Sequence, residues 1–160
     1  MLAPREQGDV GELSAIVWLA GQGFPVFKPL FHSPNYDLVA DLGPRLVRVE
    51  VKTTTRFCKG RWDVAVCTRG GNQSWNGLTK RLDPEKCDYL FVLVRDGRRW
   101  FIPSTHFGGG TCLRLGGPKY AEFEVERGDP IPEGRVSEPP LQSAISTARG
   151  DVRAAKGEAL

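Results

Sequence analysis

The stretch LVRVEVKTTT, residues 46–55, has the alternation of a half-buried β-strand. Its valines, at positions 47, 49 and 51, would share one face, because successive side chains of a strand point to opposite sides. The other face would carry Arg48, Glu50 and Lys52. Valine favours β structure, so the pattern predicts a strand with one buried apolar face and one charged face.

A second alternating stretch, 36–41, lies just upstream and is separated from the first by a Gly-Pro turn. If the two stretches form a hairpin with a four-residue loop, Asp41 pairs with Leu46. Counting outward from that pair makes one face of the hairpin entirely apolar and sets Asp37 across from Glu50 on the other face. The sequence therefore predicts two carboxylates on adjacent strands, with Cβ atoms about 4.5–5.5 Å apart.

Two carboxylates at that separation can share one divalent cation, and Mg²⁺ takes oxygen ligands at about 2.0–2.1 Å. Lys52 lies two residues beyond Glu50 on the same face, roughly 7 Å away. This group suits phosphodiester hydrolysis, in which the acids hold a metal and the ammonium orients the attacking water, accepts its proton or stabilises the transition state. The sequence leaves these three roles of Lys52 open. The alternative is an ordinary solvated strand face, with Asp37 as a nearby turn acid.

The composition is that of one globular domain. The chain has 160 residues, of which 40% are hydrophobic and 26% charged, and its net charge of +3 is too small to indicate a nucleic-acid partner by itself. The cysteines form no CxxC pair, which favours structural thiols over a zinc site; they are Cys58, Cys67, Cys87 and Cys112. We find no signal-peptide pattern and no apolar run of about 20 residues, so we expect a cytoplasmic protein without a membrane span.

The periodicity predicts an α/β (α+β) domain over residues 1–126. It begins with a helix over residues 8–20, for which Asp9 is the expected N-cap. Strands are expected at 24–31, 36–41, 46–53, 62–67, 89–94, 99–102 and 120–125, with short helices near residue 103 and in the polar segment after residue 70. Residues 127–160 are rich in Pro, Gly and charge, which predicts a flexible C-terminal tail; a partner-binding helix there is the alternative.

A helix with Glu12, a strand with Asp37 and a strand with Glu50-Val51-Lys52 follow one another in the order typical of a nuclease superfamily. Over roughly residues 8–125 the chain resembles the PD-(D/E)XK nucleases, most of all small members such as archaeal Holliday-junction resolvases and the homing endonuclease of this class in some group I introns. The resemblance implies a central mixed sheet with an αβββαβ restriction-endonuclease-like core, flanked by helices.

The resemblance also assigns site residues. Asp37 matches the aspartate of the motif, Glu50 its second acid and Lys52 its lysine, and the backbone carbonyl of Val51 would be a further ligand of Mg²⁺, for which Mn²⁺ can substitute. Glu12 matches an acid that many members carry on the first helix and would be a further catalytic and metal-binding residue. An acid early in a helix is, alternatively, favoured by the helix dipole alone. The proline of the motif is missing, which weakens the recognition more than the chemistry.

Basic residues follow the hairpin and would contact the phosphate backbone of duplex or branched DNA. The predicted DNA-binding set consists of Thr53, Arg56, Lys59, Arg61, Arg69, Lys80 and Arg81. The alternative is a solvated loop whose tryptophans, Trp62 and Trp75, pack back on the core. His32 and His106 are expected to be structural or surface residues. One site per chain predicts a homodimer or a larger symmetric assembly, because cutting two strands needs two sites.

The sequence thus predicts a divalent-metal-dependent DNA endonuclease. Two alternatives are a non-catalytic nucleic-acid-binding module of the same fold and a hydrolase of a small phosphorylated molecule, which would need a deep closed pocket. Junction resolution, homing, restriction-type and repair cleavage all stay open, because loops and assembly set the shape of the substrate.

Overall fold

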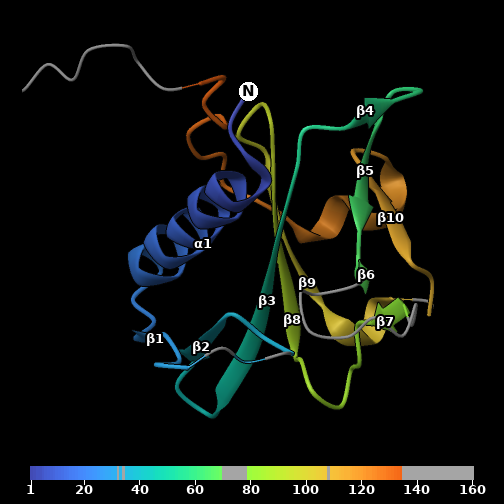
Figure 1. The fold of residues 1–160 in the computed structure, drawn as a ribbon. Helices are drawn as coiled ribbons and strands as arrows, with labels where there is room; N and C mark the ends of the chain where they lie inside the picture. Colours follow the sequence, from blue (N-terminus) through green and yellow to red (C-terminus); the bar gives the residue numbers. More distant parts are fainter. Residues whose placement is uncertain (32, 34, 70–78, 108, 135–160) are drawn as a thin grey trace, which may run out of the picture.

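The fold consists of one long helix, a six-stranded mixed sheet and two small antiparallel sheets (Figure 1). The computed structural model describes residues 1–31, 33, 35–69, 79–107 and 109–134. In the main sheet the strand order is β1-β2-β3-β8-β9-β11; β3 and β8 are parallel and the other neighbours antiparallel. Its strands are β1 (Val26–Phe27), β2 (Leu38–Asp41), β3 (Leu46–Thr54), β8 (Tyr89–Val94), β9 (Arg99–Pro103) and β11 (Glu124–Val125).

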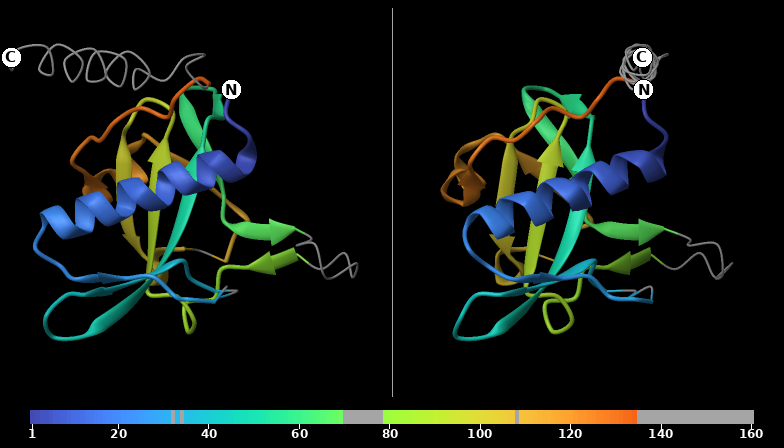
Figure 2. Two further views of the ribbon diagram at one scale, coloured as in Figure 1. Left: turned by 60° about the vertical axis from the view of Figure 1, so that its left-hand side comes forward. Right: turned by 90° about the vertical axis from the view of Figure 1, so that its left-hand side faces the viewer.

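Helix α1 (Pro4–Gly21) lies across one face of the main sheet (Figure 2). It begins at Pro4 after Ala3 as the N-cap, so the prediction of Asp9 as N-cap is wrong. Proline has the backbone angle of a helix and lacks the N–H that a first turn leaves unpaired, which explains the earlier start. The apolar side of α1 closes a core cluster made of Ala15, Leu19, Leu38, Ala40, Val47, Val49, Val51, Phe91, Leu93 and Ile131.

The other face of the main sheet is covered by strands. A three-stranded sheet in the order β10-β5-β4 contributes there to a second core cluster; the strands are β4 (Phe57–Cys58), β5 (Arg61–Ala65) and β10 (Cys112–Leu115). The expectations of a second helix in an αβββαβ core and of further flanking helices are wrong for the described ranges, where α1 is the single α-helix and the 3-10 turns η1 (Ser104–His106) and η2 (Pro118–Phe123) accompany it. Trp62 and Val64 alternate with polar residues, a period that suits a strand packed on a sheet.

No helix in the part of the chain that the structure describes is long and apolar enough to span a membrane.

A separate two-stranded sheet, β6 (Cys67–Arg69) and β7 (Thr79–Arg81), extends away from both layers (Figure 2). The segment 70–78 that joins its strands lies outside the described residues, and so does the short helix expected there. The last predicted strand, 120–125, is mostly the turn η2, and its strand β11 has only two residues.

The chain after β11 packs against the domain up to residue 131 at least. Ile131 is only 4% exposed, and its N–H donates to the carbonyl oxygen of Arg95 at 3.0 Å. Gly128 donates in the same way to the carbonyl oxygen of Gly97 at 2.9 Å. The predicted tail starts at residue 127, but a single apolar residue within a Pro- and Gly-rich segment is enough to hold the segment to the core. Residues 135–160, the rest of the predicted tail, lie outside the described residues.

Candidate active site

Strand β3 has the two faces that its alternation predicts. Its valines are buried in the core cluster beneath α1. Glu50 and Lys52 pair in the parallel ladder with Leu90 and Val92, which belong to the core cluster on the opposite side of the sheet. Neighbours in such a ladder share a face, so the charged side of β3 lies away from α1.

The β2–β3 hairpin has the predicted four-residue loop, because Asp41 pairs with Leu46 and Leu38 with Val49. The register changes at Asp37, which lies in a bend just before β2. Its N–H donates to the carbonyl oxygen of Val49 at 2.9 Å, and Leu38 also pairs with Val49, so two consecutive residues lie opposite one. This is the arrangement of a β-bulge, which adds a residue and re-aims its side chain. Asp37 is therefore one position away from the facing that the register predicts.

The carboxylate of Asp37 reaches back to β3. Its Oδ2 accepts the N–H of Val51 at 2.7 Å. Together with the bond from its N–H to Val49, this joins Asp37 to the β3 backbone at the two residues that flank Glu50. The N–H and C=O of one strand residue point to the same side, so the carbonyl of Val51 also points toward Asp37. Strand β2 begins at Leu38, which pairs with Val49, and the carbonyl of Val51 therefore lies beyond the hydrogen-bonded ladder of the hairpin.

Glu50 and Lys52 form an ion pair on the charged face of β3. Their side chains are 14% and 23% exposed, so both are largely withdrawn from water. The residues i and i+2 of a strand meet only when their long side chains bend toward each other. The structure thus places an acid, a lysine and the carboxylate of Asp37 around one short segment of β3.

Glu12 lies apart from this group. It forms an ion pair with Lys28, which follows β1 directly. The preceding residue in the chain, Gly11, approaches β3 so closely that an added Cβ would lie 2.3 Å from Cγ2 of Thr53. The side chain of Thr53, a predicted DNA contact, is therefore on the α1 side of the sheet. Among the described residues no group of three or more His, Cys, Asp or Glu is close enough to hold a metal ion.

The predicted basic residues that can be described lie mainly around the β4–β5 turn. Arg56 is 79% exposed and pairs with Asp63, and Lys59 occupies the turn with a positive φ of 47°. Arg61 donates to the carbonyl oxygen of Gly60 at 2.8 Å, and Arg81 to that of Gly109 at 3.1 Å.

Other predicted residues near this surface have different outcomes. Arg69 and Lys80 are in β6 and β7, at positions whose side chains are outside the described set. Trp62 is only 6% exposed and packs in the core, as its alternative role predicts. Trp75 and His32 lie outside the described residues. His106 makes an edge contact with Phe123, in keeping with a structural role.

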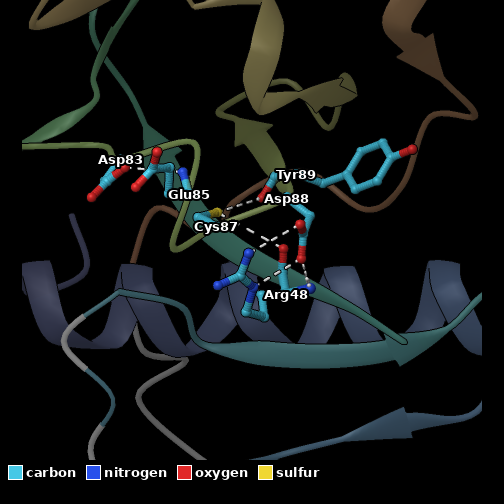
Figure 3. Close-up of polar contacts among 6 residues, drawn as sticks. All are labelled: Arg48, Asp83, Glu85, Cys87, Asp88 and Tyr89. Atoms are coloured by element: carbon cyan, nitrogen blue, oxygen red, sulfur yellow. Dashed lines mark hydrogen bonds and ion pairs between the residues drawn. The ribbon is translucent and has the colours of Figure 1, made fainter. Parts of the chain in front are cut away.

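Sequence reasoning missed the ion pair between Arg48 and Asp88, which lies next to the candidate site (Figure 3). Arg48 donates through Nε to Oδ2 at 2.9 Å and through Nη2 to Oδ1 at 3.1 Å. Its hydrogen bonds and charge hold the pKa of Asp88 below its ordinary value, against the opposing effect of burial. A charged residue directly before the buried run 89–94 is the one local signal that a partner is needed there.

Cys87 lies next to this pair, and its Sγ donates to the carbonyl oxygen of Tyr89 at 3.1 Å (Figure 3). Burial raises the pKa of its thiol to about 12. The thiol is therefore neutral at physiological pH and acts as a packed, weakly hydrogen-bonding side chain, as the spacing of the cysteines predicts.

The donor set at the hairpin suits a hard cation. Asp37 and Glu50 supply carboxylate oxygens and Val51 a carbonyl oxygen, and Mg²⁺ is commonly held by one or two carboxylates while it keeps waters and substrate phosphates. No sulfur or imidazole is part of this group, which argues against zinc. The third predicted acid, Glu12, is paired with Lys28.

Comparisons with known proteins show the family and the fold. The family model described as PD-(D/E)XK endonuclease matches residues 2–124. A solved structure of a bacterial homing endonuclease, I-Ssp6803I, is similar over 99% of this chain and 100% of that chain, with 21% sequence identity and a TM-score of 0.63. A Holliday junction resolvase, Hjc from Archaeoglobus fulgidus, is matched over 75% of this chain and 91% of that chain, with 15% identity and a TM-score of 0.47. No curated protein matches. With the family model covering most of its length, this chain belongs to the PD-(D/E)XK endonuclease family.

Proposed function

We propose that this protein is a divalent-metal-dependent endonuclease that hydrolyses phosphodiester bonds of DNA at the β2–β3 hairpin. One observation carries the proposal beyond family membership. The carboxylate of Asp37 is hydrogen-bonded to β3 at Val51, the residue between Glu50 and Lys52, which form an ion pair with each other.

Asp37, Glu50 and the carbonyl of Val51 would hold Mg²⁺, and Glu12 would join them if it exchanged Lys28 for the cation. A bound Mg²⁺ supplies Lewis-acid polarisation of the phosphate and a bound water of lowered pKa. The hydrogen bond from Val51 keeps one oxygen of Asp37 fixed, so the carboxylate loses little freedom when it binds a ligand.

Lys52 gives this site a positive charge on the same face as Glu50. An ammonium group has three donors, which can hold an attacking water in line with the phosphate or stabilise the negative charge of the transition state. The ammonium group of Lys52 is paired with the carboxylate of Glu50. Binding of the cation and DNA would replace this ion pair with two others, between Glu50 and the cation and between Lys52 and a phosphate.

DNA would lie along the charged side of β3 and the β4–β5 turn. Thr54 Oγ1 donates to the carbonyl oxygen of Asp63 at 2.8 Å and accepts the N–H of Arg56 at 3.1 Å, which ties the end of β3 to β5 next to the exposed Arg56. Arginine and lysine at such positions contact phosphates without regard to sequence. Because the two strands of a duplex are antiparallel, cleavage of both would use two copies of the chain related by symmetry.

The proposal is tested with supercoiled plasmid, linear duplex, branched junction and single-stranded DNA, each incubated with Mg²⁺ or Mn²⁺. Asp37→Asn, Glu50→Gln and Lys52→Ala are compared with the wild type, and Lys86→Ala, an exposed lysine paired with Asp83, is the matched control. We expect wild type and Lys86→Ala to cleave at equal rates, and each site variant to lose at least about 100-fold in rate, in the range of single catalytic groups.

Metal uptake is measured separately by calorimetry. Mg²⁺ or Mn²⁺ binding that disappears in Asp37→Asn and Glu50→Gln supports the site. Metal-independent DNA binding without cleavage of any substrate would instead identify a non-catalytic binding module. Cleavage by Lys52→Ala at the wild-type rate would refute the role of that lysine.

A further inference from the structure

Asp88 is a junction of hydrogen bonds at the start of β8 (Figure 3). Besides the two bonds from the guanidinium of Arg48, its Oδ2 accepts the backbone N–H of Arg48 at 2.7 Å. Its own N–H donates to the carbonyl oxygen of Arg48 at 2.9 Å, and its carbonyl accepts the N–H of Ser104 at 2.9 Å. One aspartate therefore joins β3, β8 and the end of β9.

This junction lies where β3 changes neighbours. Strand β2 pairs with β3 only up to Val49, and the parallel pairing of β3 with β8 begins at that same residue, opposite Tyr89. From Glu50 onward the ladder to β8 is the main-chain pairing that holds β3. Parallel ladders are somewhat weaker per residue than antiparallel ones, so the first rung has a large influence on the position of Glu50 and Lys52.

At that first rung Arg48 and Asp88 are joined through their backbones and also through their side chains. A fork of two parallel N–H···O bonds allows little sliding, because both oxygens and both nitrogens must stay in one plane. Arg48 is two residues from Glu50 on the same face, and both its N–H and its carbonyl are bonded to Asp88, so loss of the fork would free the β3 backbone next to Glu50 to twist. Sites that bind metals lose much of their affinity when ligands are displaced by a fraction of an ångström.

We propose that Arg48 and Asp88 are positioning residues of the metal site, which fix the β3 backbone next to Glu50, and with it the direction of the Glu50 carboxylate, through the first rung of the β3–β8 ladder. The inference rests on the proposed function, because it assigns the fork a role in a site whose cation binding is itself proposed. The fork touches neither substrate nor metal and acts through the backbone of β3.

The chain contains a matched control. Arg98 and Glu124 form the same kind of fork, with Nε···Oε1 at 2.7 Å and Nη2···Oε2 at 2.8 Å, and their side chains are half-buried like those of the Arg48 pair. This second fork lies at the β9–β11 edge, on the far side of the main sheet from the hairpin. Loss of either fork should lower the stability of the domain, whereas only loss of the first should affect the metal site.

The test compares Arg48→Met, Arg48→Lys and Asp88→Asn with Arg98→Met. Mn²⁺ affinity is measured by calorimetry, plasmid cleavage by initial rates and stability by urea unfolding. We expect Arg48→Met to weaken Mn²⁺ binding by about 10-fold or more, a typical effect of residues that orient metal ligands. Arg48→Lys should restore part of this loss, because it keeps the charge but not the fork. Arg98→Met should bind Mn²⁺ as the wild type does.

Equal Mn²⁺ affinity in Arg48→Met and wild type would overturn the positioning role, and so would equal losses in Arg48→Met and Arg98→Met, which would indicate a general effect of stability. If Arg48→Met does not fold, Asp88→Asn and Arg48→Lys decide between the same outcomes. A wild type that takes up no Mn²⁺ would refute the proposed function and this inference together, whereas normal uptake by every fork variant would refute the inference alone.

Discussion

An alanine at Gly11 should not stabilise the protein, although alanine is the better helix former. Gly11 lies in the middle of α1, where the helix crosses β3. An added Cβ would be 2.3 Å from Cγ2 of Thr53 and 3.2 Å from Cγ1 of Val51. Carbon atoms in contact are about 3.5–4.0 Å apart, so the helix or the strand must move by about 1 Å. Gly8, one turn earlier in the same helix, has no atom within 4 Å of its Cβ position.

The two effects can be compared. Replacing glycine by alanine inside a helix contributes about 0.8–1.0 kcal/mol of stability, and overpacking a core costs about 1–3 kcal/mol. Gly8→Ala should therefore stabilise the protein by about 1 kcal/mol. Gly11→Ala should leave it unchanged or destabilise it by up to about 2 kcal/mol. For a chain of this size 1 kcal/mol corresponds to about 2–4 °C in Tm.

Urea unfolding followed by circular dichroism measures both variants, and Thr53→Ser identifies the contact. Serine lacks the Cγ2 that an alanine at position 11 would strike, so Gly11→Ala should cost less in the Thr53→Ser background than in the wild type. A Gly11→Ala variant as stable as Gly8→Ala would refute the close approach of α1 and β3. Equal costs in both backgrounds would show that Thr53 is not the obstacle.

Three further outcomes are expected from other parts of the structure. Arg98, through its hydrogen bonds and charge, lowers the pKa of Glu124. The stability that this pair contributes is therefore present above the ordinary pKa of the carboxyl group and is lost as the pH falls through the lowered pKa. Urea midpoints should accordingly fall less steeply between about pH 6 and pH 3 in Arg98→Met than in the wild type. The exposed Cys112 should react with iodoacetamide at neutral pH in the native protein, whereas Cys87, buried with a pKa raised to about 12, should react only on unfolding; equal labelling by mass spectrometry would contradict its burial. Gly97→Ala should destabilise by about 2 kcal/mol or more, because Gly97 has a φ of 87° and its Cβ would lie 2.3 Å from a backbone carbonyl oxygen; an unchanged urea midpoint would refute this.

The hairpin could be predicted because its two strands alternate strictly and the register that pairs Asp41 with Leu46 makes a whole face apolar. The displacement of Asp37 could not be predicted, because a bulge depends on which backbone N–H meets which carbonyl and leaves the order of side chains unchanged. The alternation of the valines likewise fixed the buried side of β3, a local property that tertiary contacts did not override.

Contacts between distant segments were beyond the reach of the sequence. Glu12 pairs with Lys28, and Arg48 with Asp88 across forty positions, and neither spacing carries a periodic signal. The resemblance to nucleases implied flanking helices, but the alternation around Trp62 already indicated a strand there, and the local pattern was the better guide. Single buried residues such as Ile131 are hidden by the composition of the segment around them.

The carboxylate of Asp37 also has a structural role, because it accepts the N–H of Val51 where β2 offers no backbone carbonyl. Truncating it to alanine would leave a backbone donor without its acceptor and cost about 1–3 kcal/mol of stability, apart from any effect on catalysis. Asparagine keeps an acceptor of the same shape and removes only the charge. Loss of activity in Asp37→Ala could therefore come from a damaged strand or from a missing metal ligand. Comparing Asp37→Ala with Asp37→Asn separates the structural effect from the catalytic one.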